Sequence, residues 1–110
     1  MIDQGGGHII NIGSDASIRG IRGMASYVAS KHALLGMSRS ARLELHGSGV
    51  RVTTFCPGGI NLNVFGPDAE ETGSLSARDL ARTIVHLATL PPSVEVQELL
   101  VQSPLTNPVT

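Results

Sequence analysis

Three side chains in the first third of the chain have the types and spacing needed for proton transfer: Ser14, Tyr27 and Lys31. Tyr27 is the only tyrosine, and Lys31 follows it by four residues. On a helix this spacing puts both side chains on one face, with their Cβ atoms about 5–6 Å apart. A nearby ammonium group favours the phenolate form of a tyrosine and suits it for acid–base catalysis. A serine hydroxyl at the end of a strand can hold the oxygen that exchanges the proton, which indicates carbonyl–alcohol chemistry.

Hydrophobic patterning predicts the elements that position these residues. Apolar, β-branched runs bounded by glycine or proline favour strands, and apolar residues spaced three and four apart favour helices. The chain alternates between the two types, over residues 8–13 (strand), 24–46 (helix), 50–56 (strand), 76–90 (helix) and 94–101 (strand). Gly47 is expected to end the first helix in a left-handed conformation. The residues expected to be buried on the two helices are Leu34, Met37, Ala41 and Leu45, and Leu80, Ile84 and Leu87.

The order β-α-β-α-β predicts an α/β fold with a parallel sheet and right-handed crossovers. Ligands of such sheets bind beyond the carboxyl ends of the strands. Ser14 directly follows the first predicted strand, and Pro57-Gly58 follows the second. Tyr27 and Lys31 belong to the first turns of the helix that starts at the same edge. Taken singly, Tyr27 and Lys31 are more simply explained as a surface pair, Ser14 as a turn residue and Pro57-Gly58 as the end of a strand. Their convergence on one edge favours a catalytic site.

Composition excludes several function classes. The net charge of −1 gives no basic field for nucleic acid or an anionic membrane, and the 3% aromatic content gives no stacking platform. No apolar run approaches the roughly 18 residues that cross a bilayer, and the N-terminal stretch lacks the features of a signal peptide. Cys56 is the only cysteine, so we expect an inert core thiol in a reducing, cytoplasmic protein. The four histidines have no metal-ligand spacing, and no metal site is predicted.

Three motifs in this order resemble the short-chain dehydrogenases/reductases. They are NIGS (Asn11–Ser14), YVASK (Tyr27–Lys31) and the strand ending in Cys56-Pro57-Gly58, and the resemblance extends over about residues 7–101. It implies a single partial domain over residues 1–110, the C-terminal half of a Rossmann-like doubly wound sheet with three α/β/α layers. The last residues, 102–110, are expected to form a loose tail.

The resemblance also implies roles for individual residues. Tyr27 would be the general acid/base, Lys31 would activate it and bind the nicotinamide ribose, and Ser14 would hold the substrate oxygen. NAD or NADP would be the cofactor, contacted by Tyr27 and Lys31 and by Pro57, Gly58 and Ile60. The segment after Ile60 would cover a small carbonyl or alcohol substrate. Full-length relatives are expected to be homo-oligomers, with no nucleic-acid or membrane partner.

The chain differs from family members in its N-terminal region, and this difference leaves two hypotheses about its function. Family members begin with a strand, a glycine-rich turn and a helix that bind the cofactor pyrophosphate. Here Gly5-Gly6-Gly7 precedes a strand instead. The first hypothesis is that the chain is the catalytic half of an NAD(P)-dependent oxidoreductase. The alternative is a non-catalytic truncated fragment or interaction module. On either hypothesis, weak or absent cofactor binding is expected for this chain, and the first strand would present an apolar edge that is prone to pairing.

Overall fold

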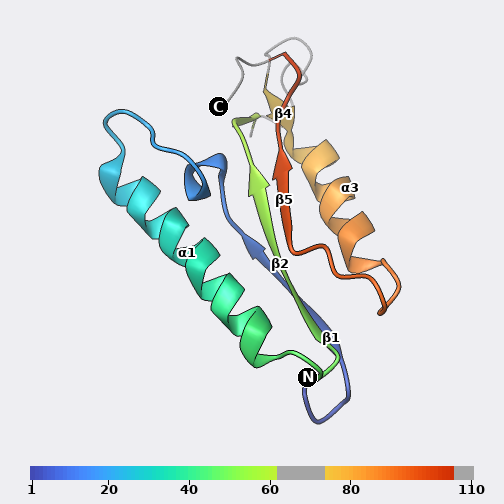
Figure 1. Ribbon diagram of the computed structural model, residues 1–110. Helices are drawn as coiled ribbons and strands as arrows, with labels where there is room; N and C mark the ends of the chain where they lie inside the picture. Colours follow the sequence, from blue (N-terminus) through green and yellow to red (C-terminus); the bar gives the residue numbers. More distant parts are fainter. Residues whose placement is uncertain (62–73, 106–110) are drawn as a thin grey trace.

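The computed structural model describes residues 1–61 and 74–105, as an open parallel sheet between two helices (Figure 1). Its elements are β1 (Gly7–Ile12), the 3-10 helix η1 (Asp15–Ser17), α1 (Ala25–Glu44), β2 (Val50–Pro57), β3 (Ile60–Asn61), β4 (Leu75–Ser76), α3 (Ala77–Ala88) and β5 (Glu98–Val101). The predicted α/β order is confirmed. The short η1 was not predicted, because the loop between Gly13 and Gly23 has no apolar periodicity. The two-residue strands β3 and β4 were not predicted either, because they are too short for a pattern to show.

The main sheet has the strand order β1-β2-β5, with both pairs parallel. Ile9 is opposite Val52, and Phe55 is opposite Leu99. A second, two-stranded sheet joins β3 to β4 in parallel, with Ile60 opposite Leu75. The central strand β2 is buried along most of its length on both faces, as expected for a strand covered by helices on either side.

The core lies between the sheet and α3, on the right in Figure 1. Phe55 of β2 is 1% exposed and packs with Leu80 and Leu87 of α3. The predicted buried face of this helix is therefore confirmed. The Ser76 hydroxyl caps α3 by accepting a hydrogen bond from the Asp79 backbone N–H at 3.0 Å.

The buried face of α1 differs from the prediction. Met37 was expected to be buried but is 58% exposed, whereas Leu35 and Ser38 are the buried residues of this helix. Ser38 donates to the Leu34 carbonyl and accepts from the amide of Asn11 on β1. A fully satisfied polar side chain thus occupies the contact with the sheet. Leu34, Ala41 and Leu45 are half-buried on this face, so the prediction from apolar spacing is wrong for Met37.

The two crossovers have opposite hands. The strands β1, β2 and β5 follow one another in one direction across the sheet, while α1 and α3 cover opposite faces (Figure 1). Two parallel crossovers that advance in the same direction on opposite faces cannot both be right-handed. The prediction of right-handed crossovers is therefore wrong for one of them. The physical reason is that β2 needs cover on both faces, and only two helices of the described chain supply it.

Element boundaries shift by a few residues from those expected. Helix α1 ends at Glu44, and Gly47 adopts a φ of +82° in the turn that follows. Most of the segment expected to cover the substrate, residues 62–73, lies outside the described residues. The expected loose tail begins with packed residues, since Ser103 is 7% exposed and accepts from the Leu105 N–H at 3.1 Å. Residues 106–110 also lie outside the described part.

Candidate functional site

The sequence predicts a ligand site at the edge where the carboxyl ends of the strands lie. In the structure, the peptide that joins Ile12 to Gly13 lies at this edge. The Gly13 N–H donates to the Phe55 carbonyl of β2 at 2.7 Å. A trans peptide directs its C=O and N–H to opposite sides, so the Ile12 carbonyl points away from β2, toward the open edge of the sheet. The end of β1 therefore presents a hydrogen-bond acceptor on that side.

Lys31 donates a hydrogen bond to this carbonyl. Its Nζ donates to the Ile12 carbonyl at 3.2 Å and lies 5.8 Å from the centroid of the Tyr27 ring. The two side chains share a face of α1, as their spacing of four residues requires. The strand end thus fixes an ammonium group beside the only tyrosine of the chain.

Tyr27 lies at the start of α1 and is 41% exposed. It borders an open hollow of about 600 Å³, which is lined by Ile21, Gly23, Met24, Ala25, Ser26 and Tyr27. No hydrogen bond joins Tyr27 to Ser14 within the described residues. Tyr27 therefore borders a space large enough for a small ligand.

Ser14 is held more tightly than a substrate-binding hydroxyl needs to be. It is 7% exposed and is the N-cap of η1, where its Oγ accepts from the Ala16 N–H at 3.1 Å. Its backbone N–H donates to the Ser17 Oγ at 3.2 Å, which completes a capping box. Its own hydroxyl proton goes to Asp15 Oδ1 at 3.0 Å.

Asp15 is a buried carboxylate that the sequence analysis did not single out. Arg19 donates to its Oδ2 from Nε at 3.2 Å and from Nη2 at 2.8 Å. Burial alone would raise the pKa of Asp15, but the hydrogen bonds from Arg19 and Ser14 outweigh burial and hold that pKa below its usual value. The available signal was an acidic residue next to the candidate serine, with an arginine four residues later.

Gln102 connects Asp15 with the end of β2. Its side chain lies close enough to lower the pKa of Asp15, although its Nε2 makes no hydrogen bond of ordinary geometry in the described structure. The same side chain packs on Gly58, where an added Cβ would collide with Gln102 Oε1. Gly58 donates its N–H to the Val101 carbonyl at 2.8 Å. The serine loop and the proline-glycine segment therefore meet at one end of the sheet.

The other residues expected at the cofactor have different environments. Pro57 is the last residue of β2 and is buried, while Ile60 begins β3 and is 39% exposed.

Cys56 is 3% exposed, and burial raises the pKa of its thiol, which is in keeping with an inert core residue. No group of three His, Cys, Asp or Glu in the described ranges could hold a metal ion.

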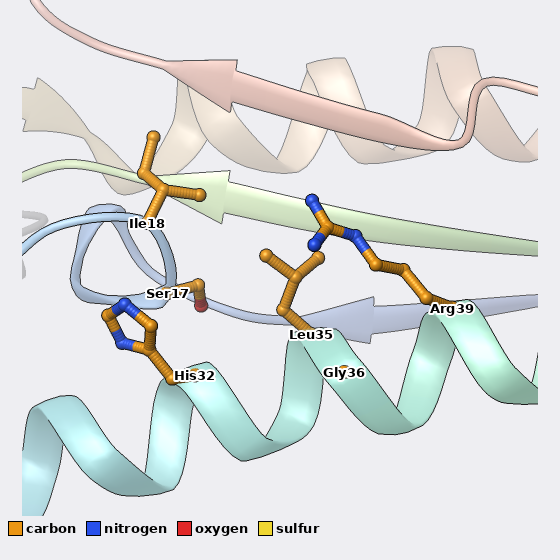
Figure 2. A pocket seen from close by; sticks show the side chains of 6 residues that line it. All are labelled: Ser17, Ile18, His32, Leu35, Gly36 and Arg39. Atoms are coloured by element: carbon orange, nitrogen blue, oxygen red, sulfur yellow. The ribbon is translucent and has the colours of Figure 1, made fainter.

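A second hollow, of about 330 Å³, lies between α1 and η1 (Figure 2). Ser17, Ile18, His32, Leu35, Gly36 and Arg39 line it. Arg39 is engaged by Glu98 of β5, with its Nε 2.6 Å from Oε1 and its Nη2 3.1 Å from Oε2. Because this guanidinium is already paired, the hollow offers no free cation to a ligand.

A family model described as short chain dehydrogenase matches residues 1–72. This chain belongs to the short-chain dehydrogenase family. Among curated proteins, an uncharacterized oxidoreductase of Staphylococcus epidermidis is 32% identical over 103 residues, covering 93% of this chain and 45% of that protein. An NADP-dependent 3-hydroxy acid dehydrogenase of Salmonella typhi is 33% identical over 108 residues, covering 87% of this chain and 44% of that protein.

Solved structures of family members have the same fold. Serine dehydrogenase from Escherichia coli matches with a TM-score of 0.84 and 31% identity, over 99% of this chain and 45% of that one. An alcohol dehydrogenase from Thermococcus sibiricus, complexed with 5-hydroxy-NADP, matches with a TM-score of 0.85 and 27% identity, over 99% and 47%. The short-chain dehydrogenase chain thus has a Rossmann-like α/β fold and spans less than half the length of these relatives. Within its described part, no helix is long and apolar enough to cross a membrane.

Proposed function

We propose that this chain carries the catalytic residues of an NAD(P)-dependent oxidoreductase that interconverts a carbonyl and a secondary alcohol. The observation that carries the proposal is the ammonium group of Lys31, held by the Ile12 carbonyl beside the ring of Tyr27. The family match favours this function over an interaction module without catalytic activity.

The residues fit a nicotinamide cofactor at this edge. Lysine has three N–H donors, and the Ile12 carbonyl takes one, so the remaining donors of Lys31 suit ribose hydroxyls. The absence of a side chain at Gly58 lets the chain pack closely against Gln102 at the end of β2. Pro57, Gly58 and Ile60 would then contact the nicotinamide end. When bound, the reduced cofactor supplies a hydride.

The protein's part of the reaction is to hold and move one proton. In reduction, the Tyr27 hydroxyl donates its proton to the substrate carbonyl oxygen as the carbon is reduced. In oxidation, the phenolate takes the proton of the alcohol. Lys31 stabilises the negative charge on the phenol oxygen, and Ser14 lies at the end of β1, where the substrate oxygen would bind.

A small 3-hydroxy acid is the substrate class to test first. Relatives are named an NADP-dependent 3-hydroxy acid dehydrogenase and a serine dehydrogenase, and serine is itself a 3-hydroxy acid. The hollow of about 600 Å³ beside Tyr27 is large enough for such a molecule. 3-Hydroxybutyrate and acetoacetate form a convenient pair, because they differ only in oxidation state.

Because weak or absent cofactor binding is expected for this chain alone, the test joins it to the N-terminal strand, glycine-rich turn and helix of a family relative. Reduction of acetoacetate by NADPH is then measured in the joined chain, in its Tyr27→Phe variant and in the control Met37→Leu. Met37 lies on the same helix but is 58% exposed. Tyr27→Phe removes only the hydroxyl, and we expect it to lower turnover by a factor of about 100 or more. Met37→Leu should leave turnover unchanged. Equal rates in the joined chain and in Tyr27→Phe would contradict the assignment.

A further inference from the structure

The hollow beside Tyr27 has a lining without ionic side chains. The described residues that line it are Ile21, Gly23, Met24, Ala25, Ser26 and Tyr27. None of the six has an ammonium, guanidinium, imidazole or carboxylate group, and Ile21 and Met24 are large and apolar. The neighbouring Arg22 is exposed and does not belong to the lining. Such a lining gains by covering an alkyl chain and offers no charged side chain to an ionic group.

A tight turn places the two apolar side chains beside Tyr27. The Met24 N–H donates to the Ile21 carbonyl at 3.1 Å, and Gly23 between them has a φ of +78°. The first and last residues of such a turn have Cα atoms less than about 7 Å apart. The Val28 N–H donates to the Met24 carbonyl at 2.9 Å, so helical hydrogen bonding begins at Met24. Tyr27 follows three residues later, which is the spacing of neighbours on a helix.

Met24 has surface left for a ligand to cover. Its side chain is 41% exposed, and as the N-cap residue of α1 it makes no capping hydrogen bond. Methionine is unbranched and polarizable, and it adapts its shape to apolar partners. Ile21, at the other end of the turn, is half-buried and supplies a firmer surface.

We propose that the hollow beside Tyr27 takes the alkyl group on the reacting carbon of the substrate, and that Met24 sets the preference for the length of that group. This inference rests on the function proposed above and narrows its substrate class to 3-hydroxy acids with an extended alkyl chain. Tyr27 exchanges a proton with the reacting oxygen, so the groups on the adjacent carbon lie close to the space that Tyr27 borders. The alkyl group enters the hollow, and the carboxylate points away from it.

The test titrates the chain with 3-hydroxybutyrate, 3-hydroxyhexanoate and 3-hydroxyoctanoate and follows the methionine methyl groups by NMR. The chain has three methionines, Met1, Met24 and Met37, so one sample holds both probe and controls. The Met24 methyl should shift saturably. Its dissociation constant should fall about twofold per added methylene, which is half the free energy of complete burial, because the hollow is open. Met37 is 58% exposed on the same helix and should show no saturable shift.

Two variants of Met24 separate a contact with the alkyl group from a structural role. Met24→Gln keeps the length of the side chain but makes it polar, and it should remove most of the dependence on chain length, read from the Ser26 amide resonance. Met24→Leu stays apolar and should restore that dependence. The control Met37→Gln should behave as the unchanged chain does. A merely structural role of Met24 would weaken binding of the three acids alike and leave the dependence in place.

The outcomes separate this inference from the function on which it rests. Dissociation constants that do not fall with chain length overturn the inference, and they are the result expected if the carboxylate lay at the backbone N–H groups of the first turn of α1. A dependence that persists in Met24→Gln also overturns it. Both results leave the proposed function in place if Tyr27→Phe still lowers turnover in the joined chain. If Tyr27→Phe keeps full turnover, the function fails, and the inference fails with it.

Discussion

At the scale of single residues, the site depends on polar groups whose hydrogen-bond partners are fixed by the protein itself. The Ile12 carbonyl faces the open edge of the sheet and receives the Lys31 ammonium. The Ser14 hydroxyl is donor to Asp15 and acceptor from Ala16. The residue types alone do not show which donors and acceptors remain available to a ligand. The hydrogen bonds that these groups already make within the protein do show it.

His8 is a second residue whose protonation is fixed by its partners. Thr53 Oγ1 donates its only proton to the Val96 carbonyl at 2.6 Å, so the His8 ring must donate from Nε2 to Thr53 Oγ1, at 2.7 Å. His8 Nδ1 is buried and finds no partner in the described structure. Burial, and then the charge of Arg51, lower the pKa of His8, while Glu95 opposes them.

This arrangement predicts a loss of stability in mild acid. The neutral ring is favoured in the folded state, so its contribution is complete above the unfolded pKa of about 6.5 and declines as pH falls toward the lower folded value. The free energy of unfolding, measured by denaturant, should fall as the pH is lowered through and below about 6.5. His8→Gln, which can still donate to Thr53, should flatten this dependence. Asp15 and Glu98, whose pKa values are lowered, act only at more acidic pH. An identical slope in His8→Gln would refute the interpretation.

At the scale of elements, the close approach of η1 to the sheet positions Ser14. Gly13 is buried where β1 turns into η1, and an added Cβ there would lie 2.8 Å from Ser17 Oγ and 3.2 Å from Cys56 Sγ. Both neighbours are buried and cannot move freely. A side chain at Gly13 would therefore push η1, with its N-cap Ser14, away from β2.

Two glycine-to-alanine substitutions should have opposite effects. Gly13→Ala should destabilise the fold by about 1–3 kcal/mol through overpacking. Gly36→Ala lies inside α1 with open space around its position, and it should stabilise the fold by about 0.5–1 kcal/mol. Thermal or denaturant unfolding of both variants measures the difference. If Gly13→Ala proved as stable as Gly36→Ala, the close approach of η1 would be refuted.

The elements also explain which predictions from sequence succeeded. The three strands of the main sheet and α3 were predictable, because β-branched runs and a strongly one-sided helix each permit one placement. The deepest contact of α1 was not predictable from apolar spacing, because it is made by the polar Ser38, whose hydrogen-bond partners are the Leu34 carbonyl and the Asn11 amide. The shared edge of Ser14, Lys31 and Gly58 followed from strand order alone. Asp15 was missed because only the side-chain geometry shows where the Ser14 proton goes.

At the scale of the whole molecule, the sheet is open at β1. Among the described residues, this strand pairs with β2 on one side only, and the Ile12 side chain is 47% exposed. An apolar, unpaired parallel edge favours strand addition from another chain. We therefore expect self-association that increases with concentration.

Sedimentation velocity tests this expectation. Ile12→Lys places a charge at the edge and should shift the chain toward the monomer. Val85→Lys adds the same charge on α3, where Val85 is 61% exposed, and should not. A chain that remains monomeric at all concentrations, or two variants that respond alike, would contradict the edge mechanism.

The central claim is that the end of β1, the first turns of α1 and the end of β2 form one site for the nicotinamide end of the cofactor. Titration of the isotopically labelled chain with reduced nicotinamide mononucleotide, followed by amide NMR, tests it most directly. We expect saturable shifts at Ser14, Tyr27, Lys31 and Gly58, with none at Val85 on α3. These shifts should be lost in Lys31→Met. Saturable shifts at other residues, with none at these four, would contradict a shared site at this edge.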